Sequence, residues 1–69
     1  MQFVIETERE DDGRWMAEIT EVPGALAYGA TEEQAKANAY ALALMVIADQ
    51  VEQSEEFPDS ISVTRAATA

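Results

Sequence analysis

The sequence contains no cysteine and no histidine, and these absences exclude several kinds of chemistry. Without cysteine the chain has no disulfide and no thiol nucleophile. Without histidine the common nucleophile–base pairs are missing, and a metal site would consist of oxygen ligands alone. We therefore expect no catalytic residue, no cofactor-binding residue and no metal ligand. A divalent-metal hydrolase is a remote alternative, because it needs several carboxylates that converge on one strand face.

Basic residues are also scarce. The chain has 4 lysines and arginines against 14 aspartates and glutamates, which gives a formal net charge of −10. Nucleic acids and anionic membranes attract positively charged proteins, so we expect no direct binding to DNA, RNA or a membrane. The charge suits a basic protein partner, whose approach it would accelerate. The alternative interpretation is that the acidic surface only keeps the chain soluble.

Long apolar runs are absent as well. The run 40–48 has no polar group except the hydroxyl of Tyr40. It is much shorter than the roughly 20 residues that cross a bilayer. The first residues, Met1 to Val4, contain neither a basic segment nor a long apolar stretch, so we expect no signal peptide and a cytoplasmic location.

The chain is short, with 69 residues. We expect one domain over residues 1–65, followed by a disordered tail over residues 66–69. A small domain buries a smaller share of its surface than a large one, so its stability is marginal without a disulfide, a metal or a partner. Because the first is excluded and the second is not expected, we predict self-association into a homo-oligomer.

Thr31–Gln53 is the only stretch that favours a long helix. Thr31 is a favourable N-cap, and Gln34 three residues later completes a capping box. Glu32 and Lys36 have the spacing of a stabilising i,i+4 ion pair. The interior is rich in alanine and leucine, which are strong helix formers.

This predicted helix carries two apolar stripes, whereas an ordinary surface helix carries one. The first stripe contains Ala35, Ala39, Leu42 and Val46, and the second contains Tyr40, Leu44, Ile47 and Val51. A sheet of the same chain can cover one stripe, and we expect a second protein chain to cover the other. The alternative is a single wide stripe whose alanines face water.

Four short strands are predicted from apolar–polar alternation and from turn residues, over 2–9, 14–20, 25–30 and 60–65. An Asp-Gly pair favours a hairpin after the first strand, and a Pro-Gly pair favours a type II turn before the third. A right-handed crossover through the helix places the fourth strand parallel to the first, which gives the order 3-2-1-4. We predict an α+β two-layer sandwich with a mainly antiparallel sheet and the helix on one face.

The alternation also predicts which strand residues face the helix, namely Phe3, Ile5, Trp15, Ala17, Ile19, Ile61 and Val63. Trp15 has two interpretations, as a core aromatic or as an interface anchor. In the third strand, either Leu26 with Tyr28 or Ala25 with Ala27 can face the helix, and the pattern leaves both open.

If the alanines face the helix, Leu26 and Tyr28 join Val4 and Met16 on the uncovered face of the sheet. An apolar patch of this kind is typical of an interface. Together with the second helical stripe, this gives the candidate protein-interface residues Met16, Leu26, Tyr28, Tyr40, Leu44, Ile47 and Val51.

The segment from Asp12 to Leu44 resembles the HicB antitoxin family. The elements that carry the resemblance follow in order as Asp12-Gly13, Trp15, Ala17, Val22-Pro23-Gly24, Gly29, Thr31, Glu33, Ala35, Asn38-Ala39 and Ala41-Leu42. Each element is weak alone, but the ordered set is fairly specific and covers about half the chain. The sequence departs from the family pattern at Glu21-Val22, where an Asp-Leu pair is frequent, and at Gln34, where glutamate is usual.

The resemblance implies a partial RNase H-like fold without nuclease activity. It also implies a partner, because HicB antitoxins neutralise a small basic mRNA-cleaving toxin, HicA, by covering its surface. Many members carry a C-terminal DNA-binding domain, which is not expected here because the chain ends after the fourth strand.

Two hypotheses of function follow. The first is a HicB-like, antitoxin-type binding module for a basic HicA-like toxin. The second is a solitary structural or regulatory homo-oligomer of HicB-like fold that has no toxin partner.

Overall fold

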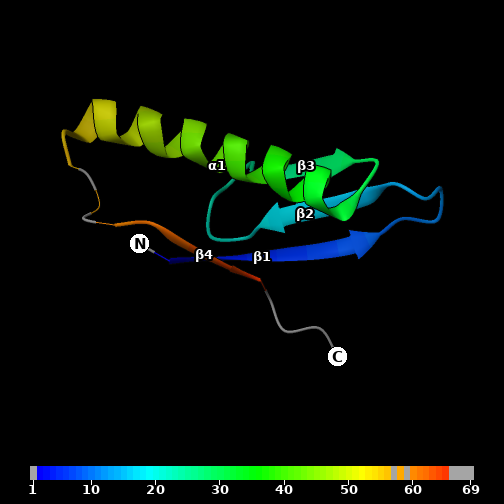
Figure 1. Ribbon diagram of the computed structural model, residues 1–69. Helices are drawn as coiled ribbons and strands as arrows, with labels where there is room; N and C mark the ends of the chain where they lie inside the picture. Colours follow the sequence, from blue (N-terminus) through cyan, green and yellow to red (C-terminus); the bar gives the residue numbers. More distant parts are fainter. Residues whose placement is uncertain (1, 57, 59, 66–69) are drawn as a thin grey trace.

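The molecule consists of two layers, a four-stranded sheet and one long helix that lies across one face of it (Figure 1). The computed structural model describes residues 2–56, 58 and 60–65, and the expected tail at 66–69 lies outside them. The elements follow in the order β1 (Gln2–Arg9), β2 (Trp15–Ile19), β3 (Leu26–Gly29), α1 (Glu32–Ser54) and β4 (Ser62–Arg65). The predicted α+β class is confirmed.

The sheet has the order β3-β2-β1-β4. Neighbouring strands β1 and β2, and likewise β2 and β3, are antiparallel, whereas β4 lies parallel to β1. The predicted order and the crossover through the helix are therefore confirmed. The turn before β3 has the predicted form, because Gly24 has a φ of 85° and the Ala25 N–H donates to the Val22 carbonyl at 3.1 Å.

The N-terminus of α1 is capped as predicted, with one difference in detail. The Thr31 hydroxyl accepts the Gln34 N–H at 3.1 Å, but the Gln34 side chain accepts from the N–H of Ala30, at 2.7 Å, and not from that of Thr31. Lys36 forms an ion pair with Glu33 at 2.9 Å. The sequence predicted Glu32 as the partner of Lys36, and that prediction is wrong. The Glu32 carboxylate accepts a hydrogen bond from the Thr7 hydroxyl of β1 at 2.8 Å, which attaches the first turn of the helix to the sheet.

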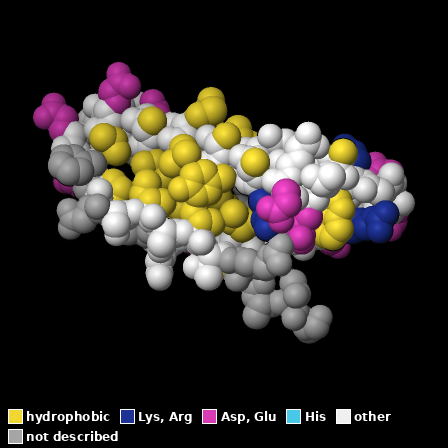
Figure 2. All heavy atoms as spheres, viewed as in Figure 1, with side chains coloured by type: hydrophobic (Ala, Val, Ile, Leu, Met, Phe, Trp, Pro, Cys, Tyr) yellow, Lys and Arg dark blue, Asp and Glu magenta, His cyan; other side chains and the backbone are white. Residues whose placement is uncertain are grey.

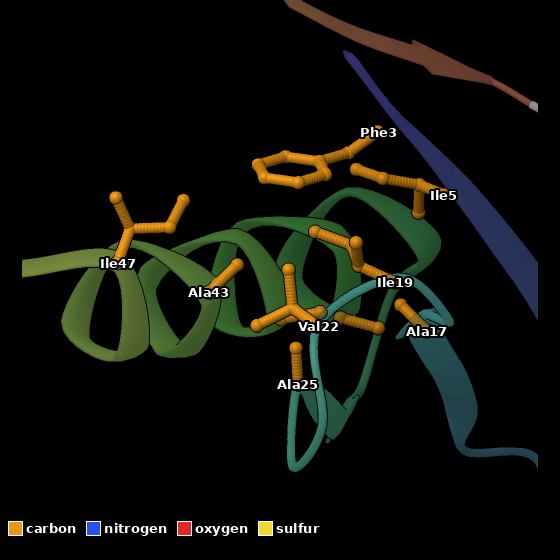
Figure 3. Packing of buried hydrophobic residues seen from close by; sticks show 10 residues of the cluster. Phe3, Ile5, Ala17, Ile19, Val22, Ala25, Ala43 and Ile47 are labelled. Atoms are coloured by element: carbon orange, nitrogen blue, oxygen red, sulfur yellow. The ribbon is translucent and has the colours of Figure 1, made fainter. Parts of the chain in front are cut away.

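The core between helix and sheet is built from small residues. Half of its ten buried members are alanines, and alanine permits a close approach of helix and sheet. Figure 3 shows Phe3, Ile5 and Ile19 of the sheet pointing toward the helix that carries Ala43 and Ile47. The buried set is Phe3, Ile5, Ala17, Ile19, Val22, Ala25, Ala35, Ala39, Ala43 and Ile47.

The C-terminus of α1 is a weak point of the fold. Glu55 closes the helix in a left-handed conformation, with a φ of 60°, and no basic residue lies in the last turn. We expect Glu55→Gly to raise the free energy of unfolding by about 0.5–1 kcal/mol, because glycine adopts this φ without strain and the substitution removes a charge opposed to the helix dipole. Urea unfolding measures the change. Glu55→Gln removes only the charge, so an equal gain from both variants would contradict the role of backbone strain.

Candidate functional site

The face of the sheet opposite α1 is covered by nothing in the part of the chain that the structure describes. We call it the open face, and its large apolar and acidic members are Val4, Glu6, Glu8, Met16, Glu18, Leu26 and Tyr28. The alternative left open in β3 is resolved here, since Ala25 is buried and Ala27 is half-buried against the helix. Leu26 and Tyr28 consequently lie on the open face, where they are 39% and 42% exposed.

Strand register sorts the open face into an apolar side and an acidic side. Met16 lies between Tyr28 on one neighbouring strand and Glu8 on the other. Glu18 lies in the same way between Leu26 and Glu6. The large apolar side chains therefore gather over β3 and β2, and the carboxylates gather over β1 and β2.

The pair Glu6 and Glu18 is unfavourable for the isolated chain. These residues are direct partners in the β1–β2 ladder, and like charges in that position destabilise a sheet. Among the described residues neither carboxylate takes part in a salt bridge or a side-chain hydrogen bond. A local arrangement that opposes folding is expected where a surface serves binding.

A cation borders the apolar side of the open face. The Arg14 guanidinium lies 4.6 Å from the centre of the Tyr28 ring, and it also pairs with the Asp12 carboxylate at 2.8 Å. The Asp12 carboxylate accepts a hydrogen bond from the backbone N–H of Arg14 at 3.0 Å, and this bond lowers the pKa of the carboxyl. The Arg14 guanidinium lowers the pKa of Asp12 further. Sequence reasoning missed this stack, because it depends on the strand register that places residue 28 beside residue 16.

A second feature lies on the helix side of the sheet. A groove of about 350 Å³ runs between α1 and the β1–β4 half of the sheet, and it is visible in Figure 2 beside the hydrophobic surface. Its lining consists of Ile5, Glu33, Lys36, Ala37, Tyr40 and Val63. The groove exists because the backbone of α1 lies close to β3 and β2, less close to β1 and, among the described residues, farther from β4.

The four candidate interface residues of the helix have different environments. Tyr40 and Val51 are half-buried against the core, and Leu44 is 40% exposed. Ile47 is only 6% exposed and belongs to the core, so its placement in an outward-facing stripe is wrong. The physical reason is that the apolar arc of α1 is continuous, and helical spacing alone does not fix where the sheet contacts it. Trp15 is half-buried and packs against the core.

Within residues 2–56, 58 and 60–65, no three acidic side chains lie close enough together to hold a metal ion. The one helix there, α1, is not apolar enough over its length to cross a membrane.

Comparison of the chain with protein-family models, with curated proteins and with solved structures finds no match.

Proposed function

We propose that this chain is a HicB-like, antitoxin-type binding module that neutralises a small basic RNA-cleaving toxin by covering its surface. The main support for this proposal is the composition of the open face. It combines exposed apolar side chains with two facing carboxylates, Glu6 and Glu18, that no described residue neutralises. The α+β fold with the order β3-β2-β1-β4 is compatible with the partial RNase H-like fold that the resemblance implies. A cytoplasmic location belongs to the proposal, since the RNA substrate of such a toxin is found there.

The two sides of the open face would contribute different parts of the binding energy. Leu26, Tyr28 and Met16 supply apolar area, and aromatic residues are frequent among the side chains that dominate binding. Glu6 and Glu18 supply complementary charge, and a lysine or arginine of the partner between them would relieve their mutual repulsion. The net charge of −10 attracts a basic partner from a distance.

The alternative proposal is a solitary structural or regulatory homo-oligomer. Its support is the exposed Leu44 beside a groove that the described residues leave unfilled. A salt-insensitive apolar interface would then be the chain's main contact.

The test is titration of the purified chain with the basic protein encoded by a neighbouring reading frame. We expect a complex whose affinity falls as the ionic strength rises, because complementary charges are screened. Isothermal calorimetry at low and at physiological salt measures this. No complex with the product of either neighbouring frame, or an affinity indifferent to salt, would overturn the antitoxin-type proposal.

A matched pair of substitutions locates the binding surface. Tyr28→Ala is expected to weaken the complex by about tenfold or more, because it removes the largest apolar side chain of the open face. Met45→Ala is the control, since Met45 is 66% exposed but belongs to α1 on the other side of the sheet. Equal affinities for the two variants would show that the partner binds elsewhere.

A further inference from the structure

The helix of this chain leaves the β4 side of the sheet face on which it lies partly exposed. It lies close to β3 and β2, and among the described residues its backbone lies farther from β4. Ile61 and Val63 consequently stay half-buried, although Val63 points to the helix side in register with Phe3. This side of the sheet is the floor of the groove, where Val63 is half-buried, Ile5 is buried beside it and Tyr40 forms a wall.

The helix continues this apolar surface beyond the groove. Residues three or four apart lie side by side on a helix, so Ala37, Tyr40 and Leu44 form one row that leads toward Val51. Figure 2 shows a continuous hydrophobic surface between α1 and β4. Among the described residues of the groove lining, the charged members are Lys36 and Glu33, which form an ion pair at 2.9 Å.

We infer that this surface binds a second copy of the chain. We call it the self-association surface and define it by Ala37, Tyr40, Leu44, Val51 and Val63. Charge decides between possible occupants. A basic partner gains little at a surface whose lysine and glutamate are already paired, and gains more at the unpaired carboxylates of the open face.

The same argument favours a self-contact at this position. Two chains of charge −10 repel each other, so they meet at least cost where the nearest charges cancel and where apolar area is exposed. A two-fold contact is the natural form, because the groove of each copy lies beside a row of apolar helix side chains that can enter the groove of the other. Each helix would then cover part of the β4 side of the sheet that the partner's own helix leaves partly exposed.

The geometry has a consequence for the assembly. The self-association surface lies on the helix side of the sheet, and the open face lies on the opposite side. Both can be occupied at once, so the dimer presents two open faces that point away from each other. This bivalence rests on the proposed function, whereas the dimer itself does not.

The first test is the mass of the chain in solution as a function of salt. We expect sedimentation equilibrium to give twice the 7.5 kDa mass of the chain. Added sodium chloride is expected to strengthen the dimer, since it screens the repulsion between two acidic chains. The sign is opposite to that expected for a complex with a basic protein, so failure of one proposal is distinguishable from failure of the other. A monomer at every salt and protein concentration, or a dimer that dissociates as salt rises, would overturn the inference.

The second test uses adjacent helix residues. Leu44→Arg places a charge on the self-association surface and is expected to weaken the dimer by about tenfold or more. Met45→Arg adds the same charge about 100° around the helix, outside that surface, and is expected to leave the dimer intact. Ala37→Arg is a further blocking variant, because Ala37 is exposed in the groove lining and arginine is a good helix former. If Ala37→Arg keeps the helical circular dichroism and the dimer mass of the wild type, the surface is not where the copies meet.

Discussion

Gly29→Ala is expected to lower the free energy of unfolding by about 2 kcal/mol or more. A Cβ atom on Gly29 would lie 2.6 Å from the backbone nitrogen of Ala35 and 3.0 Å from two carbons of Gln34. These atoms belong to the first turn of α1, which the Thr31 cap holds in place, so neither backbone can move without breaking hydrogen bonds. For a chain of this size the expected loss is a large part of a total stability on the order of 5 kcal/mol.

Chemical unfolding followed by the fluorescence of the single tryptophan, Trp15, measures the loss. Gly24→Asn is the matched control. Gly24 has a φ of 85° and nothing within 4 Å of an added Cβ, and asparagine tolerates positive φ better than other residues do. A Gly29→Ala variant as stable as the Gly24→Asn control would show that the helix does not lie this close to β3.

This close approach explains part of the resemblance to HicB antitoxins. Gly29 and Ala35 are both elements of it, and in the structure each is small because the other lies against it. Ala39 is fully buried against the sheet, and Pro23-Gly24 forms the turn that leads into β3. These positions specify the helix–sheet contact. In the proposed function, partner choice is expected to depend on other residues, above all the carboxylates and apolar side chains of the open face.

The elements and their order were predictable from the sequence, for physical reasons that act locally. Thr31 and its capping partner mark the start of α1, and alternation marks β1 over its full length. Once three strands and one helix are in sequence, the handedness of the crossover leaves a single place for β4. The predicted strands β2, β3 and β4 are each longer than observed. The reason is that the apolar–polar alternation continues into the turn residues at the strand ends.

The positions of side chains relative to distant elements were less predictable. In β3 both faces carry apolar residues, so alternation does not decide between Leu26 with Tyr28 and the alanines beside them. The tight helix–sheet contact decides it, since only the small pair fits beneath α1. Ile47 was misplaced for a related reason, because the lateral position of the helix over β2 and β3 is a property of the whole packing.

Glu18→Lys is expected to have opposite effects on stability and on partner binding. Glu18 and Glu6 lie opposite each other, so a lysine at position 18 replaces repulsion with attraction across the β1–β2 ladder. The free energy of unfolding is expected to rise by about 0.5–1 kcal/mol. Binding of the basic neighbour protein is expected to weaken by about a hundredfold, because the variant places a positive charge at the centre of the open face.

Glu52→Lys is the control for this variant, because it changes the net charge by the same amount on an exposed position of α1. It lowers long-range attraction equally and leaves the open face intact, so its effect is expected to be confined to the association rate. Thermal unfolding and calorimetry on the two variants separate the contributions. Equal losses of affinity would mean that the partner responds only to the total charge of −10. A large loss for Glu18→Lys together with higher stability is the result expected if the chain carries an unfavourable carboxylate pair because its partner uses it.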